Sequence, residues 1–204
     1  IFAQRNNVIN NKNINTLSDD FLYEIIYNLK EIKSKYLANP KSKEFLNQFK
    51  SLFGKSFTQD ETDALLNAKE VDFEKQIKDR FLEKRNERIK LIGEEKTKEI
   101  EKRIFLQVID ENWKMHIQYL EQLRQVIGLR SFGQRDPLVE YKKEAFSLFE
   151  NLLIKLKSDL VSLLINMKIV DSTESEDEFK KKQNDKFNEI TKKKMEEMNH
   201  AHVI

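Results

Sequence analysis

The side chains best suited to recognising a partner are gathered in one short segment. An aromatic residue, Phe132, lies between Gly128 and Gly133, and the side chains around it are mostly basic or amide: Arg124, Arg130, Gln134, Arg135, Lys142 and Lys143. Aromatic and arginine side chains supply large contact area and adaptable hydrogen bonds at interfaces. The segment therefore predicts contact with another polypeptide. In the alternative interpretation, Phe132 folds back onto its neighbours and the arginines pair with nearby acids.

The sequence offers little support for a catalytic, nucleotide-binding or metal-binding function. No nucleotide-binding G-x-x-x-x-G-K-[ST] motif and no cysteine is present, so thiol catalysis and thiolate metal sites are excluded and a reducing compartment fits. His200 and His202 make a poor metal site by themselves. His116 has no second histidine or carboxylate at zinc-ligand spacing and is interpreted as a polar helix residue, whereas Trp113 is interpreted as packing. We expect no catalytic, cofactor or metal site in this chain.

Two apolar stripes of similar length flank the segment and predict the helices that position it. Gly128 allows the first helix to end, while Asp136 suits an N-cap and Pro137 the first position of the next helix. A short turn between two helices favours an antiparallel hairpin. The stripes keep helical spacing and comprise Ile100, Ile104, Val108, Ile109, Trp113, Ile117, Leu120, Leu123 and Ile127, then Leu138, Tyr141, Ala145, Leu148, Phe149, Leu152, Leu156, Leu160, Leu163, Leu164 and Met167.

The part before the hairpin predicts a small helical subdomain over residues 15–69. Ser18 suits the N-cap of a first helix, which should end before Pro40. A second helix should end at Gly54, and Thr58 should begin a third. Four phenylalanines at four-residue spacing predict a core stripe: Phe45, Phe49, Phe53 and Phe57.

Residues 70–92 read as a long exposed helix in which dense charges form i,i+4 pairs. Its apolar positions are Val71, Ile77, Phe81, Ile89 and Ile92, and the following Gly93 is suited to a bend. Across the chain, 37 Lys and Arg residues nearly balance 35 Asp and Glu residues, so no electrostatic case for nucleic-acid binding exists. No apolar run is long enough to span a bilayer. Residues 171–204 are acidic and then lysine-rich, which is typical of a mobile tail.

Residues 109–153, IDENWKMHIQYLEQLRQVIGLRSFGQRDPLVEYKKEAFSLFENLL, resemble the two-helix finger of the preprotein translocase ATPase family SecA. The segments IDENWKMH, YLEQLRQVIGLR and GQRDPLVEYKKEAF follow that family's order and spacing without gaps. Upstream, IFAQRNNVI resembles the end of the family's long scaffold helix. The resemblance implies an all-α chain with the end of a scaffold helix at 1–9, a helical wing domain at 10–92, a helical scaffold domain with the two-helix finger at 93–170, and a charged tail at 171–204.

In that family, ATP hydrolysis with magnesium in two motor domains drives preproteins through the SecY channel. The resemblance therefore implies that Phe132, Arg130, Gln134 and Arg135 contact preprotein and channel, and that Trp113 and His116 lie in a region that restrains ATPase activity. Further implied partners are the SecA motor domains and a second SecA copy. The implied location is the bacterial cytoplasm and the cytoplasmic face of the inner membrane, as a peripheral protein. This chain by itself should not hydrolyse ATP.

Two departures from the family pattern stand out. The family usually has tyrosine where this chain has Phe132, so the aromatic face remains but the hydroxyl is lost. The cysteine-rich zinc module at the end of many members has no counterpart here. The main alternative function is a helical-hairpin coiled-coil interaction or scaffold protein without a translocase role. A nucleic-acid binder is a second alternative, which the near-neutral charge disfavours.

Overall fold

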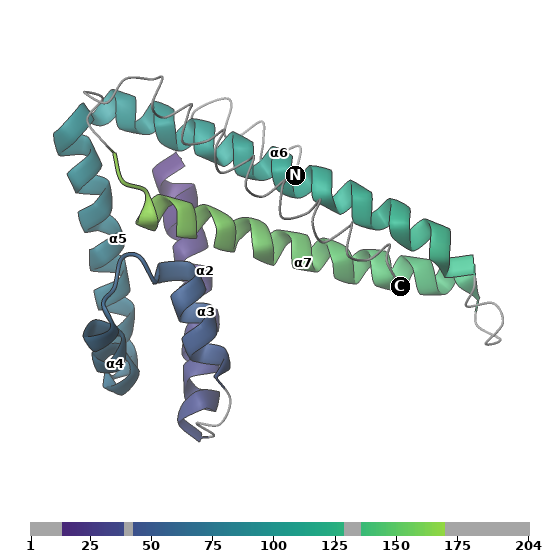
Figure 1. The fold of residues 1–204 in the computed structure, drawn as a ribbon, viewed down its shortest axis with the longest axis horizontal. Helices are drawn as coiled ribbons and strands as arrows, with labels where there is room; N and C mark the ends of the chain where they lie inside the picture. The colour runs from purple at the N-terminus through teal and green to yellow at the C-terminus, as the bar shows by residue number, and fades with distance from the viewer. Residues whose placement is uncertain (1–13, 39–42, 129–135, 170–204) are drawn as a thin grey trace, which may run out of the picture. The chain divides into compact units, whose positions relative to one another are not determined.

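The fold is built from helices alone within the residues that the structure describes, namely 14–38, 43–128 and 136–169 of a computed structural model. In chain order they are α2 (Ile14–Ala38), α3 (Glu44–Phe53), α4 (Gln59–Asn67), α5 (Glu70–Ile92), α6 (Glu94–Val126) and α7 (Pro137–Asn166) (Figure 1). The predicted all-α class is therefore confirmed. The described residues up to Met167 form one compact unit, and the description below concerns that unit.

The phenylalanine stripe predicted from the sequence forms the centre of the core. Phe45 and Phe53 are fully buried and Phe49 is 1% exposed. The ring centroid of Phe49 lies 5.7 Å from that of Phe45, 5.2 Å from that of Phe53 and 5.5 Å from that of Phe57. Aromatic pairs at these separations attract one another beyond the effect of area burial. Side chains from all the other helices complete the core around this stripe.

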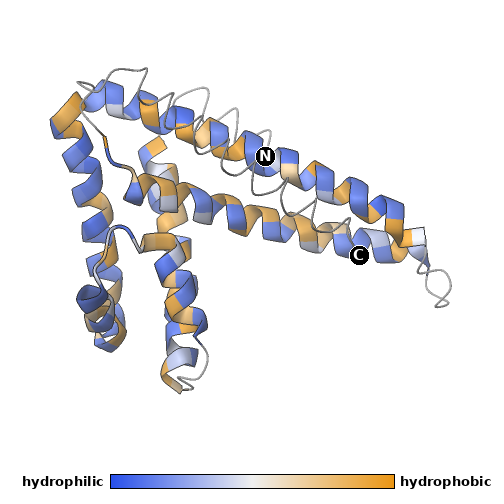
Figure 2. Ribbon diagram, viewed as in Figure 1, coloured by the Kyte–Doolittle hydropathy of each residue, from blue (hydrophilic) through white to orange (hydrophobic). Residues whose placement is uncertain are grey.

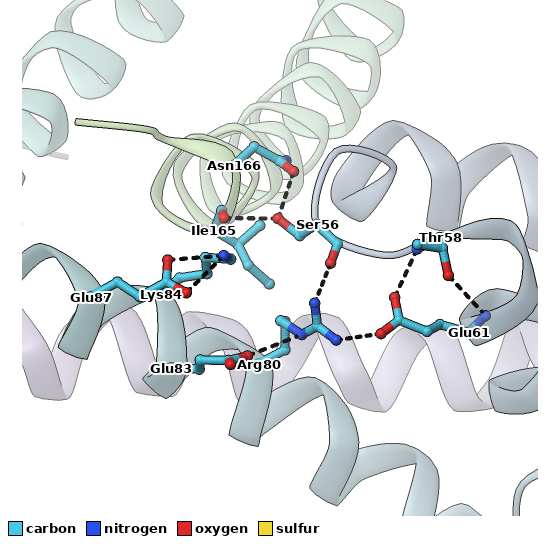
Figure 3. Close-up of polar contacts among 9 residues, drawn as sticks. All are labelled: Ser56, Thr58, Glu61, Arg80, Glu83, Lys84, Glu87, Ile165 and Asn166. Atoms are coloured by element: carbon cyan, nitrogen blue, oxygen red, sulfur yellow. Dashed lines mark hydrogen bonds and ion pairs between the residues drawn. The ribbon is translucent and has the colours of Figure 1, made fainter. Parts of the chain in front are cut away.

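The turn between α3 and α4 begins and ends as its sequence predicts. Gly54 is the C-cap of α3, and Thr58 is the N-cap of α4. The Thr58 hydroxyl accepts from the Glu61 N–H, and the Glu61 carboxylate accepts from the Thr58 N–H, which is a complete capping box (Figure 3). The backbone N–H of Thr58 is the largest cause of the lowered pKa of the Glu61 carboxyl.

Two details of the first helices differ from the prediction. Ser18 is not an N-cap, because α2 begins at Ile14 and Ser18 lies buried inside it, where its hydroxyl donates to the Asn15 carbonyl. The helix predicted over residues 70–92 is also not exposed on every side, because α5 buries one face; Val71, one of its apolar positions, lies off that face and is 77% exposed. The inner face instead carries Phe73, Ile77 and Phe81, which are spaced four residues apart.

Helices α5 and α6 meet at Gly93, and the bend predicted at this residue is confirmed. Gly93 has φ 85° and ψ 162°, a backbone region that essentially only glycine occupies. A Cβ added at this position would meet nothing within 4 Å, so backbone conformation rather than packing requires the glycine. The chain therefore stops one helix and starts the next within a single residue.

Candidate functional site on the helical hairpin

The candidate site is the hairpin of α6 and α7, whose helices pack against each other and run antiparallel (Figure 1). Their 33 and 30 residues correspond to about 50 Å and about 45 Å of helix. The backbone N–H of Ile127 bonds to the Leu123 carbonyl where α6 ends. Asp136 caps α7 by accepting from the Leu138 N–H at 2.8 Å, and Pro137 opens the helix. The predicted hairpin is confirmed, as are Asp136 as the N-cap and Pro137 at the start of its second helix, whereas the first helix ends with Ile127 rather than Gly128 as its C-cap.

The base of the hairpin belongs to the protein core, whereas its outer part does not. Phe105, Val108 and Ile109 of α6 join the core, as do five residues of α7: Leu156, Leu160, Val161, Leu164 and Ile165. Further out, Leu123, Ile127 and Leu152 are buried but lie outside that core cluster. The outer half of the hairpin is thus held together by contacts between its own two helices.

Apolar side chains also remain uncovered along this outer half. Phe146 is 62% exposed and Val139 is 58% exposed on α7, and Ile117, predicted as part of the buried stripe of α6, is 47% exposed. Apolar and polar residues alternate around both helices along their length (Figure 2). Large apolar side chains that cluster at a surface commonly mark a place where another molecule binds.

A polar and aromatic layer joins the two helices midway along the hairpin. The Asn112 side-chain amide donates to the Val108 carbonyl and to the Asp159 carboxylate, both at 3.0 Å. His116 lies one turn further out, with its ring 5.5 Å from Trp113 and 6.0 Å from Phe149 of α7. The structure therefore brings Trp113 and His116 together. His116, interpreted from the sequence as a polar residue of the helix, is only 5% exposed and therefore packs between the two helices.

A mostly apolar cavity of about 220 Å³ opens beside this layer. Residues at helical spacing on the facing sides of α6 and α7 line it: Asn112, Met115, His116, Tyr119, Leu148, Asn151, Leu152 and Lys155. The cavity lies where the core-bound base of the hairpin passes into its outer half.

Burial of His116 makes the stability of the fold depend on pH. Desolvation lowers the pKa of the imidazole below its ordinary 6.5. The unfolded chain then binds the proton more readily, so the free energy of unfolding should fall as pH drops below about 6.5 and level off below the folded-state pKa. Urea denaturation at about pH 7.5 and about pH 5.5 should show a smaller change in the His116→Gln variant than in the unmodified chain. Equal changes in the two proteins would contradict this assignment.

At its base the hairpin is bound by charged residues that sequence reasoning missed. Arg88 of α5 is 2% exposed, and Glu101 of α6 is 1% exposed. The Arg88 guanidinium donates to Glu101 at 2.7 Å through Nη2 and to the Leu164 carbonyl of α7 at 2.8 Å through Nη1. Arg85 of α5 bonds to Ser18 and Asp19 of α2. Their spacing in the sequence could have indicated that they are buried. Arg85 continues the four-residue series Phe73, Ile77 and Phe81, and Glu101 lies four residues before the buried Phe105.

A second polar cluster fastens the end of α7 to the turn between α3 and α4 (Figure 3). The Ser56 hydroxyl donates to the Ile165 carbonyl at 2.8 Å and lies 3.0 Å from the Asn166 side-chain oxygen. Arg80 of α5 donates to the Ser56 carbonyl and to Glu61. The Asn166 amide also donates to the Leu52 carbonyl at 2.7 Å. Two of these bonds pair carbonyls in the last turns of helices, those of Ile165 and Leu52, which have no partner within their own helix.

The tip residues predicted to contact a partner, Phe132, Arg130, Gln134 and Arg135, lie outside the described residues, so their roles stay predictions. The same holds for the tail and for the first thirteen residues. The proposed division at 10–92 and 93–170 also stays a prediction. Within the described ranges, no helix is both long and apolar enough to cross a membrane.

A helical core from which a long antiparallel hairpin extends defines the class of this protein as an all-helical scaffold with a projecting hairpin. A family model described as the SecA wing and scaffold domain matches residues 1–168, and the chain belongs to that family. It is 61% identical over 170 residues to the protein translocase subunit SecA of Pelagibacter ubique, covering 83% of this chain and 20% of the relative.

More distant SecA subunits match over a similar stretch. The subunit of Finegoldia magna is 33% identical over 178 residues, covering 85% of this chain and 19% of the relative. The subunit of Heliobacterium modesticaldum is 28% identical over 173 residues, covering 83% of this chain and 20% of the relative. The chain thus spans about a fifth of the length of these relatives. The matched stretch corresponds to the wing and scaffold region of the protein translocase subunit SecA.

Proposed function

We propose that this chain acts as the wing and scaffold part of a SecA translocase motor, and that the tip of its hairpin contacts the preprotein and the SecY channel. The observation that carries the proposal is a hairpin whose outer half lies outside the core and leaves Phe146 and Val139 uncovered. A projecting, partly apolar element of this kind is suited to entering another protein. Phe132, Arg130, Gln134 and Arg135 would make the contacts at its tip.

ATP hydrolysis is proposed to occur in motor domains that the relatives carry outside this region, with ATP and magnesium bound there. This chain would contribute no zinc module, since it has no cysteine. The hairpin would transmit the motor's movement to the polypeptide. Trp113 and His116 would restrain the ATPase: the His116 ring contacts Phe149 and so links the two hairpin helices at mid-length, and the Trp113 ring packs on His116.

We further propose that the protein binds peripherally at the cytoplasmic face of the bacterial inner membrane, where it would meet the SecY channel, and otherwise resides in the cytoplasm. The same uncovered apolar residues would support pairing with a second SecA copy. Nucleic acid is not a proposed partner, because the charges of the chain nearly balance.

The test is site-specific crosslinking from the tip in a translocase assembled with this chain as its wing and scaffold part. The chain has no native cysteine, so Phe132→Cys introduces a single reactive thiol. With a preprotein stalled during transport, a thiol-reactive photocrosslinker at this position should capture both the preprotein and SecY. A matched variant, Lys96→Cys, carries the same probe on an exposed residue at the base of α6 and should capture neither.

Loss of both adducts at Phe132→Cys, with transport intact, would exclude the proposed contacts. The alternative of a coiled-coil protein makes opposite predictions. It requires a stable self-associated helical species, and it tolerates charge reversal at Arg130 and Arg135. Under the translocase proposal, the same reversals should abolish preprotein transport while the isolated chain keeps its helical content.

A further inference from the structure

We propose that Arg88 is a positioning residue, which sets the direction in which the hairpin leaves the wing helices. Its guanidinium is the one group in the described part of the chain that donates at once to both hairpin helices and belongs to neither. Nη2 holds the Glu101 carboxylate of α6, and Nη1 holds the Leu164 carbonyl of α7. A rigid, planar fork can hold two acceptors in one fixed relation.

The turn next to Arg88 leaves this angle to be set elsewhere. Gly93 joins α5 to α6 in a glycine-only backbone conformation, with no atom within 4 Å of where its Cβ would be. A side chain at Gly93 itself therefore does not set the angle. Contacts between the helices on either side of the turn hold it, and the bond between Arg88 and Glu101, at 2.7 Å, is one that spans the turn.

The end of α7 depends on the same residue. Leu164 lies in the last turn of the helix, where carbonyls have no partner from their own helix. Arg88 supplies that partner, so α7 is seated on α5 at the point where α6 is also bound. Arg85, one turn earlier, has its hydrogen bonds with α2, and its Nε lies 3.9 Å from Glu101. Arg88 is thus the residue of α5 whose side chain hydrogen-bonds to both hairpin helices, in addition to the apolar packing that α5 shares with them.

The experiment measures the angle directly in the full chain. Spin labels are attached at Gln76→Cys on α5 and Gln122→Cys on α6, which are both exposed positions. Pulsed electron–electron double resonance then measures the distance between the two labels. Gln122 lies about 43 Å along α6 from Gly93, so a rotation of about 10° at the corner moves that label by about 7 Å. Arg88→Met should shift and broaden the distance distribution by several ångströms. Arg88→Lys, which keeps a charge near Glu101 but loses the fork, should broaden it less.

Two controls separate positioning from general loss of stability. Ile77→Val removes one methylene from a fully buried residue of α5 and should lower the unfolding midpoint without changing the distance distribution. Arg103→Lys alters an exposed ion pair on α6 and should change neither. An unchanged distribution in Arg88→Met, or an equal change in Ile77→Val, would overturn the proposal.

The consequence for transport rests on the proposed function, but the distance measurement does not. If Arg88 positions the hairpin of a translocase, Arg88→Lys should reduce the number of residues transported per ATP hydrolysed while leaving ATP affinity unchanged. Failure of the Phe132 crosslinks together with a shifted distance in Arg88→Met would reject the proposed function alone. If the Phe132→Cys crosslinks form but the label distance in Arg88→Met is unchanged, the positioning role alone would be rejected.

Discussion

Replacing Phe49 with alanine should lower the free energy of unfolding by about 3–5 kcal/mol, as expected for a phenylalanine removed from a close-packed core. Its ring is 1% exposed and touches three other phenylalanine rings, those of Phe45, Phe53 and Phe57. The loss has two parts, the transfer free energy of the ring and the cavity left among neighbours that cannot close over it. Urea denaturation followed by circular dichroism measures the change.

Phe146→Ala provides a matched control for this experiment. The same atoms are removed, but Phe146 is 62% exposed on the outer hairpin. A surface substitution of this kind should change the free energy of unfolding by no more than about 0.5 kcal/mol. Similar losses in the two variants would show that Phe146 is covered in solution, for example by a second copy of the chain. A small loss in Phe49→Ala would contradict the central place of the phenylalanine stripe.

The features that could be read from the sequence are those in which local chemistry and apolar periodicity agree. The phenylalanine stripe repeats at four-residue spacing on one helix and its following turn, so its burial follows from geometry alone. Thr58 and Glu61 form a capping box that needs no tertiary partner. Asp136 and Pro137 likewise begin α7 through local backbone preferences. Each of these predictions is confirmed because nothing distant competes with it.

The features that the sequence concealed depend on partners far along the chain. Ser18 looks like an N-cap, yet Arg85, 67 positions away, bonds to its hydroxyl within the core. Arg88 and Glu101 look like solvent-facing charges, because their burial depends on α7 arriving beside them. His116 was interpreted from its immediate neighbours, whereas Phe149 of α7 covers it. The predicted tip contact stays a prediction, since residues 129–135 lie outside the described ranges.

Breaking the buried pair of Arg88 and Glu101 from either side should cost about 3–5 kcal/mol of unfolding free energy, because the remaining charge stays buried without its partner. Glu101→Leu leaves Arg88 facing an apolar side chain. Arg88→Met leaves the Glu101 carboxylate with only the more distant Arg85, at 3.9 Å, and also removes the donor to the Leu164 carbonyl. Urea denaturation of both single variants gives these two values.

The double variant Arg88→Met with Glu101→Leu decides what the pair contributes as a whole. Removing both charges together should cost less than either single change, since no unpaired charge then remains in the core. A residual loss of about 1–3 kcal/mol is expected from the buried Leu164 carbonyl, which keeps no donor. The pair itself is imperfect, because Glu101 Oε2 and Arg88 Nε are buried and form no hydrogen bond within the described part of the chain.

A double variant that loses as much as the two single variants combined would mean that the two residues act independently, contrary to the 2.7 Å contact. The expected non-additivity would instead show that this pair adds little net stability while strongly penalising any arrangement in which the two residues separate. Such a pair selects one arrangement of α5, α6 and α7 over others that bury the same apolar surface. That selection is the property required of the base of a hairpin that must point in a fixed direction.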